Sequence, residues 1–324
     1  MTLDAQILSA LREAGPHGIQ TSVLAGRCKT PATTVTERVR ELGQLGYEIE
    51  STPHLGLRLI ASPDVLHADE LLSRLTLGQV VGRDVRVFQE TSSTNDVVEK
   101  LARDGVREGV VVLAESQSRG RGRLGRKWVS PAGLGLWFSV LLRPSLPLGA
   151  VTQLTIMAAT AVARAVRTET GLVPQIKWPN DILLRGRKVA GILTELSAES
   201  DRISHVVLGI GVDVNVLEFP VELDGVATSL AREAGRSFNR AALAAALFTE
   251  LDRDYARVGR GDFPALAEEW EQQCVTLGQL VRIHIGPRMV TGRAESLDTD
   301  GALLVRSDYG HLERIIGGDV VIEK

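Results

Sequence analysis

The sequence predicts an α+β protein whose central part is a mixed or antiparallel sheet with covering helices. Three observations support this prediction. Apolar residues at helical spacing dominate the first 45 positions, strand-like runs alternate with amphipathic segments over residues 83–273, and short strand-like runs separated by turns make up residues 274–324. At 324 residues the chain is long enough for two or three domains with substantial cores.

Composition excludes several classes of protein. A hydrophobic fraction of 44% and a charged fraction of 24% indicate a globular protein, and a net charge of -3 gives no global attraction to nucleic acid. Only Cys28 and Cys274 are present, so we expect neither a disulfide framework nor a metal site made by the protein alone. No segment has the uninterrupted apolar length of a signal peptide or membrane span. We therefore expect a cytoplasmic protein without a membrane partner.

Residues 1–63 are expected to form the first domain, because their apolar positions predict three helices and a hairpin. The predicted elements are a helix from Leu3 that ends at Gly15-Pro16, a helix over Thr21–Arg27, a helix from Pro31 that ends at Gly46, and strands over 47–50 and 57–60. This arrangement resembles the winged helix-turn-helix of bacterial regulators, whose third helix enters the major groove of DNA.

DNA contacts are predicted from the third helix and the hairpin of this domain. The candidates are Thr33, Thr34, Thr36 and Arg38 on the helix, with His54 and Arg58 on the hairpin. Four acidic residues offset the cations nearby, so the basic surface expected of a tight DNA-binding protein is weak. Two interpretations stay open: an operator-binding domain, and a structural domain that does not bind DNA.

The central domain is predicted over residues 83–273, after a connecting helix or linker over residues 64–82. Its predicted strands are Val85–Phe88, Val110–Ala114, a hairpin within 174–184, Val189–Leu196 after a turn at Arg185–Lys188, and Val206–Asn215. Its predicted helices follow Thr91–Asp96 and cover Thr152–Val166, Arg240–Leu251 and Phe263–Trp270. Gly209 and Gly211 lie inside a strand, which indicates either a bulge or a close approach of another group.

A glycine-rich cationic loop over Gly120–Trp128 is the most informative stretch of the chain. Three glycines alternate there with four Arg or Lys residues, which brings backbone N–H groups and cationic side chains into one small volume. A dinucleotide fingerprint is excluded because Pro131 and Gly133 prevent a following helix. A P-loop is excluded because Arg126 replaces its lysine and no Ser or Thr follows. We favour an anion-binding loop over a solvated basic hairpin.

Several motifs together resemble the biotin protein ligases. They are Ser93-Thr94-Asn95, Gln117 with the Gly120–Trp128 loop, Lys177-Trp178-Pro179-Asn180-Asp181, and Lys188-Val189-Ala190-Gly191-Ile192-Leu193. With the N-terminal helices in front, the chain is similar to the bifunctional ligases and biotin operon repressors of bacteria over nearly its whole length. The resemblance implies a class II synthetase-like ligase fold for residues 83–273 and a small SH3-like β-barrel for residues 274–324.

The resemblance also implies a reaction and a set of site residues. Biotin and MgATP give biotinyl-5′-AMP, and a lysine of the biotin carboxyl carrier protein then displaces AMP. The implied catalytic residues are Lys188, Arg123 and Asp181. The implied biotin-binding residues are Ser93, Thr94, Asn95, Gln117, Arg121, Gly122, Arg123 and Lys188. The implied ATP- or adenylate-binding residues are Gly120, Arg121, Arg123, Arg126, Lys127, Trp128, Asn180, Lys188, Asn215 and Phe219.

Some consequences of the resemblance stay open at this point. Asp181 either orients groups or eases deprotonation of the incoming lysine, and Lys177 forms either a structural ion pair or a phosphate contact. Adenylate binding is expected to favour a homodimer whose paired N-terminal domains match a two-fold operator. The alternatives are a ligase with an N-terminal domain that does not bind DNA, and a DNA-binding regulator with an inactive ligase fold.

Overall fold

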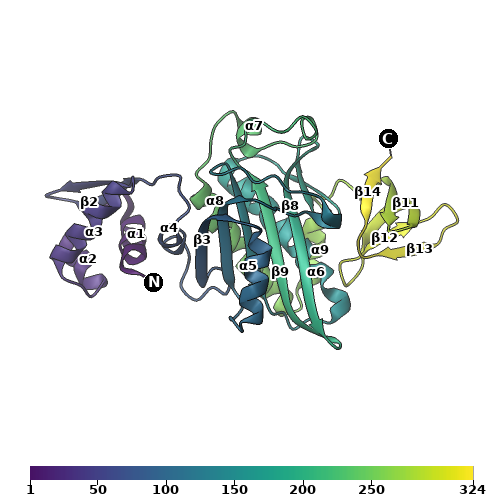
Figure 1. Cartoon of the computed structure of the whole chain (residues 1–324), viewed down its shortest axis with the longest axis horizontal. Coiled ribbons are helices and arrows are strands. Elements are labelled where there is room, and N and C mark those ends of the chain that lie inside the picture. The colour runs from purple at the N-terminus through teal and green to yellow at the C-terminus, as the bar shows by residue number, and fades with distance from the viewer. Residues whose placement is uncertain (324) are drawn as a thin grey trace. The chain divides into compact units, whose positions relative to one another are not determined.

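The computed structural model describes residues 1–323 and divides into two compact units. The first unit contains residues 1–77 together with 239–245, and the second contains residues 78–238 together with the chain from residue 246. The C-terminal segment therefore clusters with the central part of the chain. Figure 1 shows the course of the chain within each unit.

The first unit contains the three helices and the hairpin that the sequence predicts. They are α1 (Leu3–Ala14), α2 (Thr21–Arg27), α3 (Ala32–Gln44), β1 (Glu48–Thr52) and β2 (Gly56–Ala61). The Thr2 hydroxyl accepts a hydrogen bond from the Ala5 backbone N–H and caps α1. Gly15 ends α1 with a φ of 52°, which a residue with a side chain adopts at a cost.

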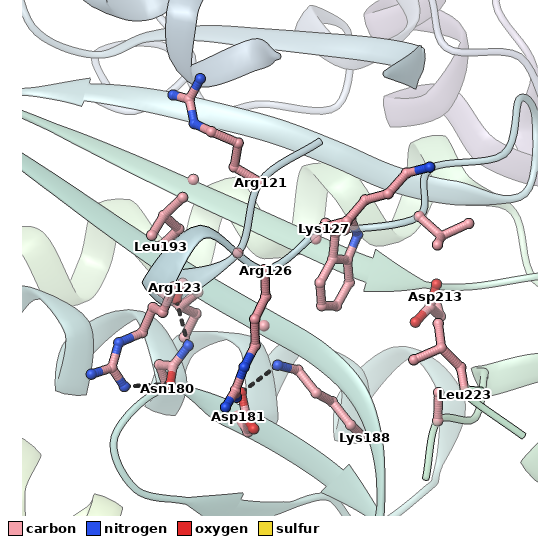
Figure 2. Close-up of a pocket in the computed structure, with 18 of the residues that line it drawn as sticks. Arg121, Arg123, Arg126, Lys127, Asn180, Asp181, Lys188, Leu193, Asp213 and Leu223 are labelled. Atoms are coloured by element: carbon pink, nitrogen blue, oxygen red, sulfur yellow. Dashed lines mark hydrogen bonds and ion pairs between the residues drawn. The ribbon is translucent and has the colours of Figure 1, made fainter. Parts of the chain in front are cut away.

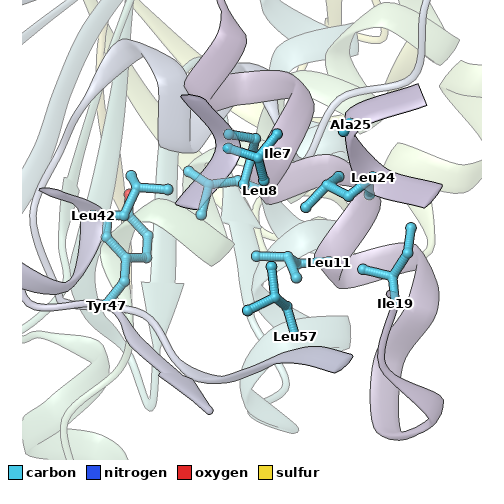
Figure 3. Close-up of a cluster of buried hydrophobic side chains, with 11 residues drawn as sticks. Ile7, Leu8, Leu11, Ile19, Leu24, Ala25, Leu42, Tyr47 and Leu57 are labelled. Carbon is cyan, nitrogen blue, oxygen red and sulfur yellow. The ribbon is translucent and has the colours of Figure 1, made fainter. Parts of the chain in front are cut away.

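A compact apolar cluster holds this unit together. Figure 3 shows side chains from α1, α2, α3 and the hairpin that point toward one another. Its buried members are Ile7, Leu8, Ala10, Leu11, Ile19, Leu24, Ala25, Val35, Leu42, Tyr47 and Leu57. Because α1 contributes four of these residues at helical spacing, the periodicity seen in the sequence marks the buried face of that helix.

The connecting helix predicted within residues 64–82 is short, because α4 covers only Ala68–Leu72. The fully buried Glu70 side chain accepts hydrogen bonds from Arg12 at 2.6 Å, Arg74 at 2.7 Å and the Tyr47 hydroxyl at 2.9 Å. Burial, together with the nearby Glu70 carboxylate, raises the pKa of Tyr47. A buried carboxylate with three donors therefore fixes α4 against α1 within the unit.

The second unit is built on a seven-stranded mixed sheet in the order β3-β4-β5-β9-β8-β7-β6. Its strands are β3 (Asp84–Thr91), β4 (Val110–Gln117), β5 (Gly135–Leu142), β6 (Gln175–Lys177), β7 (Asp181–Leu184), β8 (Arg187–Glu199) and β9 (Arg202–Asp213). β3 and β4 are parallel, and the other neighbouring pairs are antiparallel. The predicted mixed sheet is confirmed, although the sequence reading did not identify β5.

The helices after residue 78 are α5 (Thr94–Arg103), α6 (Thr152–Thr170), α7 (Leu230–Ala234), α8 (Arg240–Gly259) and α9 (Phe263–Glu271). Of these, α5 and α6 contact the sheet, α8 packs Phe248 against Phe138 of β5, and α9 packs on α6. Val98 and Ala102 of α5 pack against Val110, Val112, Leu141 and Val207 of the sheet. The short 3₁₀ turns lie at 15–17, 123–125 and 148–150. This packing buries the apolar face of α5 and brings its N-terminus to the carboxyl ends of β3 and β4.

By length and composition alone, residues 148–170 could cross a membrane, so the expectation that no segment has the apolar length of a membrane span was wrong. Of the most apolar window in this segment, 67% is buried inside the protein. Its helical part, α6, contacts α9 and β8. Burial against neighbouring elements accounts for the apolar composition of α6.

The C-terminal part forms a five-stranded antiparallel sheet in the order β13-β12-β11-β10-β14. Its strands are β10 (Leu280–Ile285), β11 (Arg288–Leu297), β12 (Leu303–Arg306), β13 (Leu312–Ile315) and β14 (Asp319–Ile322). Alternate residues of β10 are buried, as Val281 and Ile283 are, so one face of this sheet forms a small core.

Candidate active site

A cavity of about 590 Å³ lies in the second unit, where the glycine-rich loop, the β6–β7 turn and the segment after β9 meet. Residues 318–320 at the start of β14 also line it. The predicted site residues that line it are Ser93, Thr94, Asn95, Gln117, Arg121, Gly122, Arg123, Arg126, Lys127, Trp128, Asn180, Asp181, Lys188 and Phe219. Gly120 and Asn215 are outside this lining.

The glycine-rich loop is a tight hairpin that folds along the cavity. The Trp128 N–H donates to the Gly120 carbonyl at 2.9 Å, and the Gly122 N–H donates to the Arg126 carbonyl at 2.7 Å. A Cβ atom on Gly120 would lie 2.4 Å from the Trp128 carbonyl oxygen, so the hairpin itself requires that glycine. The loop is therefore both a hairpin and part of a cavity wall.

Trp128 lies in a slot made by glycines of the sheet. A Cβ atom on Gly211 of β9 would lie 2.6 Å from the Trp128 indole, and one on Gly191 of β8 would lie 2.9 Å from it. A Cβ atom on Gly209 would lie 2.2 Å from the Asn95 side chain. The glycines of β9 therefore mark close approaches of other side chains, one of the two options left open by the sequence.

Lys188 and Asp181 form an ion pair in the cavity, with 2.5 Å between Nζ and the carboxylate oxygen (Figure 2). Lys188 belongs to β8, where the sequence predicted a turn. Its backbone is fixed by hydrogen bonds with Val226 and Thr228. Its ammonium lies 5.2 Å from the centre of a Trp128 ring. The lysine is thus held between a carboxylate and an aromatic face.

Arg123 extends from the hairpin to the β6–β7 turn. Its guanidinium donates to the Asn180 amide oxygen at 3.0 Å and to the Gly318 carbonyl at 3.3 Å. Asn180 is oriented by its own hydrogen bond to the Ile192 carbonyl at 2.8 Å. Burial lowers the pKa of Arg123, and the carboxylates of Asp181 and Asp319 oppose this effect. Arg123, Asp181 and Lys188 are therefore gathered at one end of the cavity.

A hydrogen-bonded wall of polar side chains lies between α5, β4 and β5. The Thr94 N–H donates to the Gln117 amide oxygen at 2.9 Å, and the Gln117 amide donates to the Ser130 hydroxyl at 2.9 Å. The hydroxyls of Thr94 and Ser139 lie 2.7 Å apart. Ser93, Thr94 and Asn95 are each less than 5% exposed. Buried polar groups that line a cavity suit a ligand with its own donors and acceptors.

Two other loop cations are paired with carboxylates from different elements. Arg121 donates to Asp96 of α5 at 2.5 Å and to Glu195 of β8 at 3.3 Å. Its guanidinium points away from Lys188 and Asp181 in Figure 2. Arg126 pairs with Asp319 of β14. The hairpin is therefore tied to α5, to β8 and to the C-terminal sheet.

Asp213, at the end of β9, is a cavity residue that the sequence reading missed. It is 7% exposed, and no hydrogen bond joins its carboxyl to another described side chain. Burial raises its pKa well above the ordinary value, although the Lys188 ammonium opposes this effect. The available signal was a single carboxyl directly after the apolar run Val206–Val212.

Asn215 and Phe219 follow in the segment after β9. The Asn215 amide donates to the Phe238 carbonyl at 2.9 Å, and its oxygen accepts from the Phe238 N–H at 3.0 Å. Asn215 thus joins two backbone segments. Phe219 lines the cavity, and the Arg232 guanidinium lies 5.4 Å from the centre of its ring.

The predicted DNA-contacting residues lie on the surface of the first unit. Thr33, Thr36 and His54 are exposed, and Thr34 is half-buried. Arg38 pairs with Asp4 and Glu41, and Arg58 pairs with Glu50. Arg40, which was not among these candidates, is exposed on the same face of α3 as Thr33 and Thr36.

Within residues 1–323, no group of three or more His, Cys, Asp or Glu side chains could hold a metal ion. The donors that face the cavity are mainly Lys, Arg and amide groups, which bind anions. The site thus offers a cationic end for phosphate or carboxylate oxygens and a neutral polar wall for another part of a ligand.

Comparisons with known proteins agree with this geometry. Residues 87–213 match the Biotin/lipoate A/B protein ligase family, and residues 276–322 match the Biotin protein ligase C terminal domain. The bifunctional ligase/repressor BirA of Bacillus subtilis is 34% identical over 98% of both chains, and that of Escherichia coli is 29% identical over 88% of this chain and 87% of that one. The biotin--[acetyl-CoA-carboxylase] ligase of Mycobacterium tuberculosis is 36% identical over 74% of this chain and 89% of that one.

Solved structures give the same result for the fold. The biotin protein ligase from Aquifex aeolicus in complex with biotin and ATP has a TM-score of 0.65 at 29% identity, and the match covers 75% of this chain and 99% of that one. The Leishmania major ligase in complex with biotinyl-5-AMP has a TM-score of 0.51 at 26% identity, over 72% of this chain and 98% of that one. The sequence match over both full chains and the shared fold show that this chain belongs to the biotin protein ligase family.

Proposed function

We propose that this protein activates biotin with ATP to form biotinyl-5′-AMP and transfers biotin to a lysine of the biotin carboxyl carrier protein. The activities named for its relatives support the reaction class. The observation that carries the proposal is the Lys188–Asp181 pair, which lies in one cavity with the cationic hairpin and a buried polar wall. ATP would enter with Mg²⁺, because the phosphates themselves supply oxygen ligands for that ion.

In the first step, a biotin carboxylate oxygen attacks the α-phosphorus of ATP. The bond from that phosphorus to the bridging oxygen breaks, and pyrophosphate leaves. Negative charge builds on the phosphate oxygens in the transition state, so fixed cations lower the barrier. Lys188 and Arg123 are suited to this role, because one is held by Asp181 and the other by Asn180.

In the second step, the amine of the carrier lysine attacks the acyl carbon of the adenylate. The bond between that carbon and the phosphate oxygen breaks, AMP leaves, and the nitrogen loses a proton. Asp181 is the carboxylate nearest to Lys188, so we propose that it orients the reacting groups or accepts this proton. The protein needs no nucleophile of its own, because the substrates supply both.

We further propose that the polar wall binds the ureido ring of biotin, with Ser93, Thr94, Asn95 and Gln117 as its partners. The hairpin backbone at Gly122 would contact the carboxylate and phosphate. Adenine would lie toward Asp213 and Phe219, both of which line the cavity.

We propose that the chain consists of a winged helix-turn-helix domain (1–63), a connecting helix or linker (64–82), a catalytic domain (83–273) and an SH3-like C-terminal domain (274–324). The matches at 87–213 and 276–322 support the last two. The three helices and hairpin of the first unit support the first.

Biotin-dependent exchange of label between pyrophosphate and ATP tests the ligase activity directly. We expect exchange that requires both biotin and Mg²⁺, followed by biotinylation of an added carrier domain. Absence of exchange in well-folded protein would contradict the proposal and would favour a regulator with an inactive ligase fold.

We also propose a second function as a biotin-responsive repressor that binds operator DNA as a homodimer. The full-length similarity to bifunctional ligase/repressors supports it, as do the exposed Thr33, Thr36 and Arg40 on α3. A mobility-shift assay with the protein's own promoter region, with biotin and ATP present, tests it. We expect sequence-specific DNA binding that requires both ligands. Sequence-independent DNA binding that salt abolishes would contradict the repressor function and would favour a ligase whose N-terminal domain does not bind operator DNA.

A further inference from the structure

Glu195 of β8 lies behind the cavity wall and contacts two parts of the site. One of its carboxylate oxygens accepts a hydrogen bond from the Asn95 amide at 2.7 Å. Both of its oxygens lie 3.3 Å from the Arg121 guanidinium of the hairpin. Glu195 is outside the cavity lining, whereas Asn95 and Arg121 belong to it. The residue therefore joins the fixed wall to the loop that folds along it.

The Glu195 carboxylate determines which way the Asn95 amide points. A carboxylate only accepts hydrogen bonds, so the Asn95 NH₂ group must face Glu195. The Asn95 oxygen then faces Ser139 and accepts its hydroxyl proton at 2.5 Å. A neutral amide at position 195 could present either its oxygen or its NH₂ group, so this direction would no longer be imposed.

The direction of the Ser139–Asn95 hydrogen bond also fixes the direction of the hydrogen bond between Thr94 and Ser139. Ser139 has one hydroxyl proton and gives it to Asn95, so it must accept at its 2.7 Å contact with Thr94. Thr94 then donates its one hydroxyl proton to Ser139 rather than to the Gln117 amide oxygen 3.3 Å away, and the Thr94 oxygen keeps acceptor capacity. An acceptor at this position suits a ligand N–H, and the ureido ring of biotin carries two of them.

The hairpin end of the contact is fixed by a second carboxylate. Arg121 also donates to Asp96 at 2.5 Å, and Asp96 accepts from the Ser92 hydroxyl at 3.1 Å. The side chains of Arg121 and Glu195 are each about 40% exposed, so this pair contributes modest stability by itself. Its effect is on geometry, because it holds the start of the hairpin next to the wall that Glu195 orders.

We infer that Glu195 is a positioning residue for biotin, which sets the donor and acceptor directions of the Asn95-Ser139-Thr94 wall and holds the glycine-rich hairpin through Arg121. This inference rests on the proposed ligase activity. Glu195, although it lies outside the cavity lining, would thereby select a ligand that offers N–H donors to Thr94.

The test is a comparison of Glu195→Gln, Arg121→Gln and the double variant with the wild-type protein in biotin-dependent pyrophosphate exchange. Glu195→Gln should raise the KM for biotin about tenfold, the loss expected for one misdirected hydrogen bond to a buried group. Its kcat, its KM for ATP and its Tm should stay near the wild-type values. The double variant should be less impaired than the product of the two single effects predicts, since both changes break one contact.

Glu199→Gln is the matched control, because it makes the same substitution on the same strand at an exposed position and should leave the KM for biotin unchanged. A wild-type KM for biotin in Glu195→Gln would overturn the inference, as would strictly multiplicative effects in the double variant. If Glu195→Gln does not fold, an unchanged KM for biotin in Arg121→Gln overturns the hairpin contact. Absence of exchange in the wild-type protein would instead reject the proposed function.

Discussion

At the residue scale, the proposed chemistry gives Lys188 the central role. Asp181 and Trp128 hold its ammonium in the cavity, where it can neutralise phosphate oxygens. We predict that Lys188→Ala lowers the rate of adenylate formation roughly a hundredfold, the loss typical of one transition-state contact. Biotin binding should change less. Pyrophosphate exchange and biotin titration measure the two quantities, and the exposed Lys100→Ala of α5 is the control. Near-normal exchange in Lys188→Ala would remove Lys188 from the mechanism.

Asp213 gives a prediction about stability and pH. Its pKa is raised in the folded protein, so the folded state binds the proton more tightly than the unfolded state does. Ionisation of Asp213 therefore destabilises the fold as pH rises above the ordinary value for Asp of about 4. We predict that Asp213→Asn raises Tm at neutral pH and that this gain disappears near pH 4. A difference in Tm that is constant over pH would contradict the assigned burial.

Most individual site residues could be proposed from the sequence because they lie in motifs with characteristic spacing. Of these, Lys188, Asp181 and Arg123 do lie together in the structure. Asn215 was predicted to bind the adenylate, but its side chain hydrogen-bonds to the Phe238 backbone. A polar residue at the end of a strand can bind backbone as readily as a ligand, and the sequence does not distinguish the two. Glu195 could not be found either, because its role depends on neighbours that are distant in sequence.

At the element scale, the position of Trp128 depends on glycines in β8 and β9. A methyl group on Gly211 would lie 2.6 Å from the indole, so the ring must move or the strand must shift. We predict that Gly211→Ala lowers the free energy of unfolding by about 1–3 kcal/mol and raises the KM for biotin. Thermal unfolding and exchange kinetics measure both effects.

Gly149→Ala is the control for this change, because nothing lies within 4 Å of its added methyl group. It should retain normal kinetics. If Gly211→Ala behaves in the same way, the close packing of Trp128 on β9 is wrong.

The elements themselves were predictable to different degrees. A helix with one apolar face, such as α1, follows directly from periodicity, whereas α6 is buried on nearly all sides and follows from its long apolar run. β5 is buried along all of its eight residues, so it lacks the alternation that identifies a half-exposed strand. The short α4 was predicted too long, because the burial of Glu70, which shapes that segment, has no signal in the local sequence.

At the scale of the whole molecule, the C-terminal sheet contributes to the site of the second unit. Asp319 pairs with Arg126 of the hairpin, and residues 318–320 line the cavity. We predict that Asp319→Asn raises the KM for ATP a few-fold, a modest effect because the Arg126 side chain is largely exposed. Steady-state exchange measures it. Glu295→Gln breaks an exposed pair with Arg306 in the same sheet and should change nothing. Equal kinetics for both variants would show that the contact is dispensable.

The division of the chain was only partly readable from its sequence. Changes in pattern near residues 63 and 274 indicate separate regions, and the family matches begin at residues 87 and 276. The sequence did not predict that residues 239–245 belong to the first unit. Their placement depends on contacts with residues distant in sequence, such as the hydrogen bond from the Arg240 N–H to Asp64 at 2.8 Å. Long-range contacts of this kind have no periodicity in the sequence.

The most direct test of the central claim is a crystal structure of the protein with biotin and ATP. We predict biotinyl-5′-AMP in the cavity lined by Thr94, Gly122 and Lys188, with its phosphate next to the Lys188 ammonium and its ureido ring on the Thr94 wall. Ligands bound elsewhere, with this cavity empty, would contradict the proposed site.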